Sequence, residues 1–164
     1  RVISAAGQVP VHRESDGASD AIESAVKLLE LGHCVGVYPE GTLTRDENLW
    51  PMVAKTGAAR IAIKSGAPVI PVAQWGDQNF IPRYSTKIGW YKRHKVSMVA
   101  GKPIDLSKWH DKADEPAAMK EATAHIMREI TKLLEGIRRE SAPTTIFDPH
   151  ESGLPRFGNP KKAK

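Results

Sequence analysis

The chain has 164 residues, 40% of them hydrophobic and 26% charged, with a formal net charge of +5 and an isoelectric point near 9.4. This length fits one domain, and this composition is ordinary for a globular protein and argues against wholesale disorder. The apolar runs are each a few residues long, far short of the roughly 20 residues that span a bilayer. The positive charge suits an anionic partner, which could be a phosphorylated substrate, an acyl-thioester carrier, an acidic lipid surface or nucleic acid.

The chain begins with Arg1 rather than Met and shows no signal-peptide pattern, so we expect it to be an internal piece of a longer protein. A single cysteine, Cys34, cannot form an intramolecular disulfide, which favours a reducing compartment. Cys34 opens the apolar run Cys34-Val35-Gly36-Val37-Tyr38. We therefore expect it to be a small core residue rather than a nucleophile.

The first half of the chain predicts alternating strands and helices. Strands are expected at 8–11 and 34–38, helices at about 19–31 and 56–65, and a polar loop at 39–50. Ser19 is a candidate cap for the first helix, and Gly32 and Gly66 are natural stops for the two helices. The unbroken apolar run at 34–38 suits a strand that is covered on both faces.

The second half predicts strands at 69–73 and 95–100 and a long helix at 116–139. Apolar residues recur in this helix at spacings of three and four, which indicates one buried face. The stretch 80–95 mixes aromatic and basic residues and suits a hairpin or a lid. Pro, Gly and Lys dominate after residue 140, so we expect a domain at 1–140 and a flexible tail at 141–164.

This alternation of strands and helices predicts an α/β domain. Sheets of this class usually bind ligands beyond the carboxyl ends of their strands. Two of these ends carry Arg13 and the turn Pro39-Glu40-Gly41-Thr42. Both segments are therefore expected to contribute to one ligand site.

The residue types at these strand ends suit a small phosphorylated polyol. Arg13 offers a planar fork of donors for a phosphate, and Gly41 allows a ligand to approach the backbone closely. Glu40 can accept from a substrate hydroxyl or orient a cation. The candidate site consists of Arg13, Glu40, Gly41, Thr42, Arg45 and Lys55. Each feature alone has a plainer explanation, because most such turns are only turns and most exposed arginines are solvated charges.

The order of three segments resembles the second, third and fourth motifs of the glycerolipid acyltransferase family. These segments are Gly7-Gln8-Val9-Pro10-Val11-His12-Arg13, Tyr38-Pro39-Glu40-Gly41-Thr42 and Val69-Ile70-Pro71-Val72. Lys55-Thr56-Gly57-Ala58-Ala59 is similar to the Lys-x-Gly-Ala helix start of that family, and the resemblance covers roughly residues 1–105. Leu43-Thr44-Arg45 departs from the usual Arg-Ser and is similar to the actinobacterial branch.

The resemblance implies a mixed central sheet flanked by helices, with its N-terminal part missing from this chain. It implies acyl transfer from acyl-CoA or acyl-carrier protein to 1-acylglycerol 3-phosphate, giving phosphatidic acid, with no further cofactor. The implied partners are the lysophospholipid, the thioester donor and a membrane surface, and the implied location is the cytoplasmic face of the cell membrane. Glycerol 3-phosphate or another lysolipid stays open as acceptor, and so does a non-catalytic lipid- or anion-binding module.

The first motif of that family, His-x-x-x-x-Asp, is absent, because none of the six histidines has Asp five positions later. In the family's mechanism this histidine is the general base, and the aspartate fixes its tautomer. We therefore expect no catalytic residue in this chain, a dyad upstream of Arg1, and no useful turnover by the chain alone. His12 is set aside as a substitute base, since adjacent strand residues point to opposite faces.

Other classes of partner have less support from the sequence. Residues 80–84 and 90–95 combine rings with cations, which suits a lipid–water interface, the phosphates of coenzyme A, an acidic carrier or simply a solvated hairpin. No zinc-ligand spacing, helix-turn-helix pattern or RNA-binding signature occurs, so neither a metal nor nucleic acid is expected.

Overall fold

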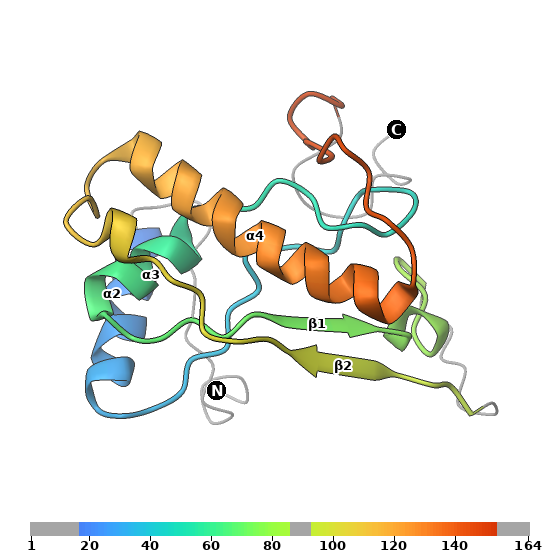
Figure 1. Cartoon of the computed structure of the whole chain (residues 1–164), viewed down its shortest axis with the longest axis horizontal. Helices are drawn as coiled ribbons and strands as arrows, with labels where there is room; N and C mark the ends of the chain where they lie inside the picture. Colours follow the sequence, from blue (N-terminus) through green and yellow to red (C-terminus); the bar gives the residue numbers. More distant parts are fainter. Residues whose placement is uncertain (1–16, 86–92, 154–164) are drawn as a thin grey trace. The chain divides into compact units, whose positions relative to one another are not determined.

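The computed structural model describes residues 17–85 and 93–153 (Figure 1). The elements within these ranges are α2 (Gly17–Glu30), α3 (Gly57–Ser65), β1 (Val72–Trp75), η1 (Asp77–Asn79), β2 (Ser97–Ala100), η2 (Ser107–Trp109) and α4 (Pro116–Arg138). They group into two compact units. The described part of the first unit is 17–39, 55–69 and 105–123, and that of the second is 40–54, 70–85, 93–104 and 124–153.

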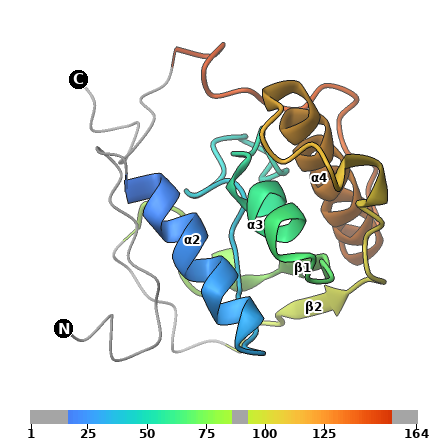
Figure 2. The same ribbon diagram turned by 90° about the vertical axis from the view of Figure 1, so that its left-hand side faces the viewer.

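In the first unit, α2 and α3 pack side by side (Figure 2). Both helices bury small residues: Ala25 of α2 and Ala59 of α3 are almost completely shielded from solvent. The predicted boundaries of α3 are confirmed: Gly66 follows it in the left-handed conformation and donates its N–H to the carbonyl of Ala62.

The predicted stop of α2 is confirmed, but its predicted start is wrong. Gly32 has a φ of 81°, and its N–H donates to the Leu29 carbonyl at 2.9 Å, which ends the helix as a left-handed glycine does. The helix begins at Gly17, so Ser19 lies within its first turn and not at its cap. Helix starts are hard to place from a single candidate cap, because several neighbouring residues can begin the turn.

In the second unit, β1 and β2 form a two-stranded antiparallel sheet in which Val72 pairs with Ala100 and Trp75 with Ser97. Ala73 is buried and Trp75 half-buried on the face that packs against the last turns of α4 (Figure 1). The core of this unit gathers residues from β1, α4, the segment after α4 and the loop before α3: Trp50, Ala73 and Leu134, with Trp75, Leu133, Ile137 and Ala142 packed against them.

The predictions for the second half of the chain largely agree with this unit. The strand expected at 95–100 is present as β2, and the long helix is present as α4. The strand expected at 69–73 begins later, at Val72, because Pro71 has no N–H to give to a ladder; its carbonyl accepts from Gly101 N at 2.9 Å. None of the helices in the described ranges combines the length and the apolar character needed to cross a membrane.

The prediction of a buried strand at 34–38 is wrong in this structure. These residues form no strand, Cys34 is exposed rather than in the core, and Tyr38 is 89% exposed. An apolar run becomes a strand only where a neighbouring strand completes its hydrogen bonds, and no strand of the described ranges pairs with it. The two-stranded sheet is consistent with an α/β domain, but the predicted mixed central sheet is not confirmed.

The first part of the predicted tail makes specific contacts in the second unit. Ala142 N donates to Glu135 Oε1 at 2.7 Å, and Val53 N donates to the Phe147 carbonyl at 3.0 Å. Met52 and Phe147 form a parallel bridge. Residues 154–164 lie outside the described ranges, so the boundary at residue 140 and the flexibility of the tail stay predictions.

Substitution of the glycine between β1 and η1 tests the packing of this glycine against the segment before β2. Gly76 has a φ of 111°, and a Cβ there would lie 2.1 Å from the backbone oxygen of Lys95. We expect Gly76→Ala to lower the free energy of unfolding by at least about 2 kcal/mol, because both the dihedral and the contact resist a side chain. Gly136→Ala in α4 is the matched control. Apart from its chain neighbours and the backbone of its own helix, nothing lies within 4 Å of a Cβ added there, and this variant should gain about 0.5–1 kcal/mol. Equal urea midpoints for the two variants would contradict the placement of Gly76.

Candidate functional site

Four of the six candidate residues lie in one loop of the second unit. This segment, residues 40–54, is called the motif loop; it contains Glu40, Gly41, Thr42 and Arg45 and has no helix or strand of its own. Glu40 closes the loop: its Oε1 accepts from the backbone N of Met52 at 2.6 Å. A single carboxylate therefore ties the start of the loop to a residue twelve positions later.

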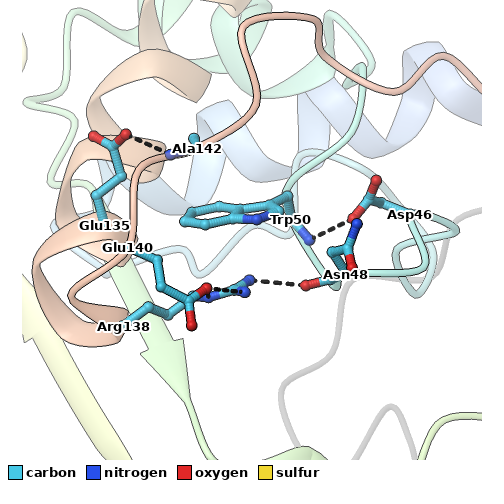
Figure 3. Close-up of polar contacts among 7 residues, drawn as sticks. All are labelled: Asp46, Asn48, Trp50, Glu135, Arg138, Glu140 and Ala142. Atoms are coloured by element: carbon cyan, nitrogen blue, oxygen red, sulfur yellow. Dashed lines mark hydrogen bonds and ion pairs between the residues drawn. The ribbon is translucent and has the colours of Figure 1, made fainter.

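Side chains of the loop itself complete its hydrogen bonds. Thr44 Oγ1 donates to the Trp50 carbonyl at 2.6 Å and accepts from Asp46 N at 3.3 Å. Asp46 Oδ1 in turn accepts from Trp50 N at 3.0 Å (Figure 3). Short side chains of Thr and Asp suit such local bonds to the backbone. Leu49, with a φ of 64°, takes the left-handed turn that this arrangement requires.

Two arginines from other segments of the same unit hold the carbonyls of the motif loop. Arg83 Nη1 donates to the carbonyls of Thr44 at 2.6 Å and Asp46 at 2.8 Å. Arg138 Nη1, at the end of α4, donates to the carbonyl of Asn48 at 2.8 Å (Figure 3). The sequence reasoning missed both roles. Local patterns carry no signal for them, since each arginine is far along the chain from the carbonyl that it holds.

Burial changes the acid–base character of the closing carboxyl group. Desolvation raises the pKa of Glu40 from 4.5 to about 7, and the hydrogen bond from Met52 opposes part of that rise. Near neutral pH, the group therefore lies close to the midpoint of its titration. As a carboxylate or as a carboxylic acid, Glu40 can still accept the Met52 N–H through one oxygen.

The other candidate residues of the loop differ in how far they are exposed to solvent. Gly41 is exposed with a φ of 65°, and Thr42 is half-buried, so the turn is open to a ligand on its backbone. Arg45 is only 4% exposed. A substrate phosphate would reach its guanidinium only after a local rearrangement, whereas the Gly41 turn is accessible as it stands.

The remaining two candidates are not part of the motif loop. Lys55 is exposed just before α3 and belongs to the first unit, where its backbone N donates to the Pro39 carbonyl at 3.0 Å. Arg13 lies outside the described residues. Within those residues no group of three or more histidine, cysteine or acidic side chains could hold a metal ion.

Comparisons with known proteins give the context of the motif loop. A family model described as Acyltransferase matches residues 1–75, which include the whole motif loop and α3. The chain is 32% identical over 128 residues to the 1-acyl-sn-glycerol-3-phosphate acyltransferase of Bacillus subtilis (strain 168), covering 77% of this chain and 58% of that protein. It is 34% identical over 103 residues to a chloroplastic 1-acyl-sn-glycerol-3-phosphate acyltransferase of Brassica napus, covering 62% and 29%.

A third relative, the 1-acyl-sn-glycerol-3-phosphate acyltransferase of Borreliella burgdorferi, is 33% identical over 75 residues, covering 45% of this chain and 29% of that protein. No solved structure matches the chain significantly. The predicted resemblance to the glycerolipid acyltransferases is confirmed by these matches. The chain spans 58% of the length of the first of these relatives and 29% of the length of the other two.

The raised pKa of Glu40 predicts a pH-dependent stability. Because the folded-state pKa lies above 4.5, the folded chain binds more protons than the unfolded chain between about pH 4.5 and 7. The stabilising contribution is full below pH 4.5 and is lost as the pH rises through 7. In Glu40→Gln the amide oxygen can still accept from Met52 but does not titrate. We expect this variant to gain stability relative to the unchanged chain between pH 5 and pH 7.5 in urea unfolding. A difference that stays constant over this range would refute the burial of the carboxyl group.

Proposed function

We propose that the protein to which this chain belongs transfers an acyl group from a thioester donor to 1-acylglycerol 3-phosphate and produces phosphatidic acid. Support comes from relatives whose names state this activity and from the family match over residues 1–75. The observation that carries most weight is the motif loop. The hydrogen bonds of this loop hold the exposed turn at Gly41 in one conformation, and the backbone of the turn stays accessible to a small anionic ligand.

Each candidate residue has a distinct role in the proposed binding of the acceptor. Arg13 would grip the phosphate with two parallel N–H donors. The exposed turn at Gly41 would offer backbone N–H groups at close range, and the hydroxyl of Thr42 would meet the glycerol. Glu40 would act chiefly by holding the loop closed through Met52. Arg45 and Lys55 would add positive charge that favours an anionic acceptor.

Binding in this way would prepare the acceptor for reaction. The free hydroxyl of the lysophospholipid attacks the thioester carbonyl, the carbon–oxygen bond forms, the carbon–sulfur bond breaks, and the thiol leaves with the proton. A base must take the hydroxyl proton in this step, and none of the six histidines stands in the His-x-x-x-x-Asp pattern. The residues of this chain would therefore position the acceptor, which can lower the barrier by several kcal/mol, while the dyad comes from a longer chain.

The test of this function compares the chain with a longer version that carries an upstream His-x-x-x-x-Asp motif. We expect the longer version to convert lysophosphatidic acid and acyl-CoA or acyl-carrier protein to phosphatidic acid, and the 164-residue chain to show no transfer above background. Mass spectrometry of the lipid product measures both. Glycerol 3-phosphate and lysophosphatidylcholine serve as competing acceptors. A longer version without transfer to any of them, or equal transfer by the short chain, would refute the proposal.

We also propose that the protein works at the cytoplasmic face of the cell membrane. Phe80 is partly exposed and Ile81 is 51% exposed, and the basic residues Arg93 and Lys95 are exposed in the same unit. The rings of Phe80 and His94 meet edge to face with centroids 6.2 Å apart. This contact brings the apolar residues near Phe80 close to the basic residues on either side of His94. Apolar side chains next to cations suit the interface of a membrane with anionic headgroups.

Vesicle sedimentation tests this surface. The chain should bind vesicles that contain phosphatidylglycerol more strongly than vesicles of phosphatidylcholine alone. Lys95→Gln should weaken binding to the anionic vesicles roughly fivefold, since each basic residue near the surface contributes about 1 kcal/mol. Lys120→Gln removes an exposed charge from α4 and is the control. Equal losses for the two variants would show that net charge, not this surface, governs binding.

A further inference from the structure

The side chain of Arg138 lies between two tryptophan rings. Its guanidinium carbon is 3.9 Å from the centroid of the Trp50 ring and 4.3 Å from that of Trp75. Trp50 belongs to the motif loop and Trp75 ends β1, so one cation joins two segments of the second unit to the last residue of α4. The Arg138 side chain is only 8% exposed, and cation–π contacts that are removed from water are the stronger ones.

Hydrogen bonds fix the orientation of the same guanidinium. Nη1 donates to the Asn48 carbonyl at 2.8 Å, while Nε and Nη2 donate to Glu140 Oε2 at 3.1 and 2.6 Å (Figure 3). The planar fork can therefore stack on both rings and bond in its own plane at once. A lysine ammonium could make one of these contacts but not the set.

The residues that Arg138 holds are the ones on which the motif loop depends. Trp50 is bonded through its N to Asp46 and through its carbonyl to Thr44, so a shift of Trp50 would release both bonds. Met52, two residues further, carries the N–H that Glu40 accepts. A contact at the end of α4 is thus connected through the backbone to the carboxylate that closes the loop beside Gly41.

We propose that Arg138 is a positioning residue that holds the motif loop in the conformation that binds the phosphorylated acceptor. This inference rests on the proposed function for the identity of the ligand. If the binding-competent loop is only a fraction of the population, the apparent dissociation constant rises by the inverse of that fraction. Losing the cation between the rings increases the population of open loops and weakens binding without touching the ligand.

The experiment measures loop opening and ligand binding in the same 164-residue chain. Arg138→Met keeps most of the side-chain length but removes the cation and its donors, and Arg138→Lys keeps the charge but removes the fork. Arg128→Met is the matched control, since it changes an exposed arginine of the same helix. Hydrogen exchange is followed at the amides of Trp50 and Met52, and the dissociation constant for glycerol 3-phosphate and for short-chain lysophosphatidic acid is measured by calorimetry.

We expect Arg138→Met to speed exchange at Trp50 and Met52 about tenfold and to weaken binding of the ligand by a similar factor. Arg138→Lys should show a smaller change of the same kind, and Arg128→Met should show none. Amides in the middle of α4 should keep their protection in all three variants. This local pattern separates a positioning role from a loss of overall stability.

Three outcomes would overturn the proposal: unchanged exchange in the loop, exchange that rises equally throughout the unit, or a loop that opens while the ligand affinity stays the same. If Arg138→Met does not fold, Glu140→Gln replaces it. Glu140 is exposed, and the variant should give about a threefold effect in the same direction. If the unchanged chain binds neither ligand, the proposed function fails, while the exchange data still decide whether Arg138 holds the loop.

Discussion

A loop without regular structure must satisfy its backbone polar groups through side chains or water, and the motif loop of this chain does so largely with side chains. Three hydrogen bonds inside the loop involve the side chains of Thr44 and Asp46, and a fourth, to the carboxyl group of Glu40, closes the loop on Met52. The loop contains no helix or strand. The conformation of the accessible turn at Gly41 therefore depends on these four hydrogen bonds. The ordered backbone is thus a consequence of polar residues placed where the chain turns.

Side chains from other segments also hold the loop: two arginines donate charge-assisted hydrogen bonds to its backbone carbonyls. Arg83 reaches two carbonyls and Arg138 a third, and Arg138 adds the stack between Trp50 and Trp75. A guanidinium suits this purpose because it can donate several bonds in one plane and present both faces to aromatic rings. These two arginines show that basic residues in this protein serve the scaffold as well as the anionic partner that its net charge suggests.

Much of the local structure follows from patterns within short stretches. The apolar spacing of α4 and the glycines that end α2 and α3 report interactions between near neighbours, and the structure confirms them. The failed prediction of a strand at 34–38 has a non-local cause. The run at 34–38 has strand-forming residues but pairs with no strand of the described ranges, and Cys34 is consequently exposed. A strand is a property of two segments, so a pattern in one cannot ensure it.

The sequence by itself determined the family, the helices and the stretch that carries four of the candidate residues, because motif order and helical periodicity are written along the chain. Only the tertiary structure decided that Glu40 closes the loop on Met52, that Arg45 is buried, and that Arg83 and Arg138 hold carbonyls far away in the sequence. Backbone carbonyls are the same in every residue. Which carbonyl an arginine reaches is therefore settled by the packing of the folded chain and leaves no trace in the local sequence.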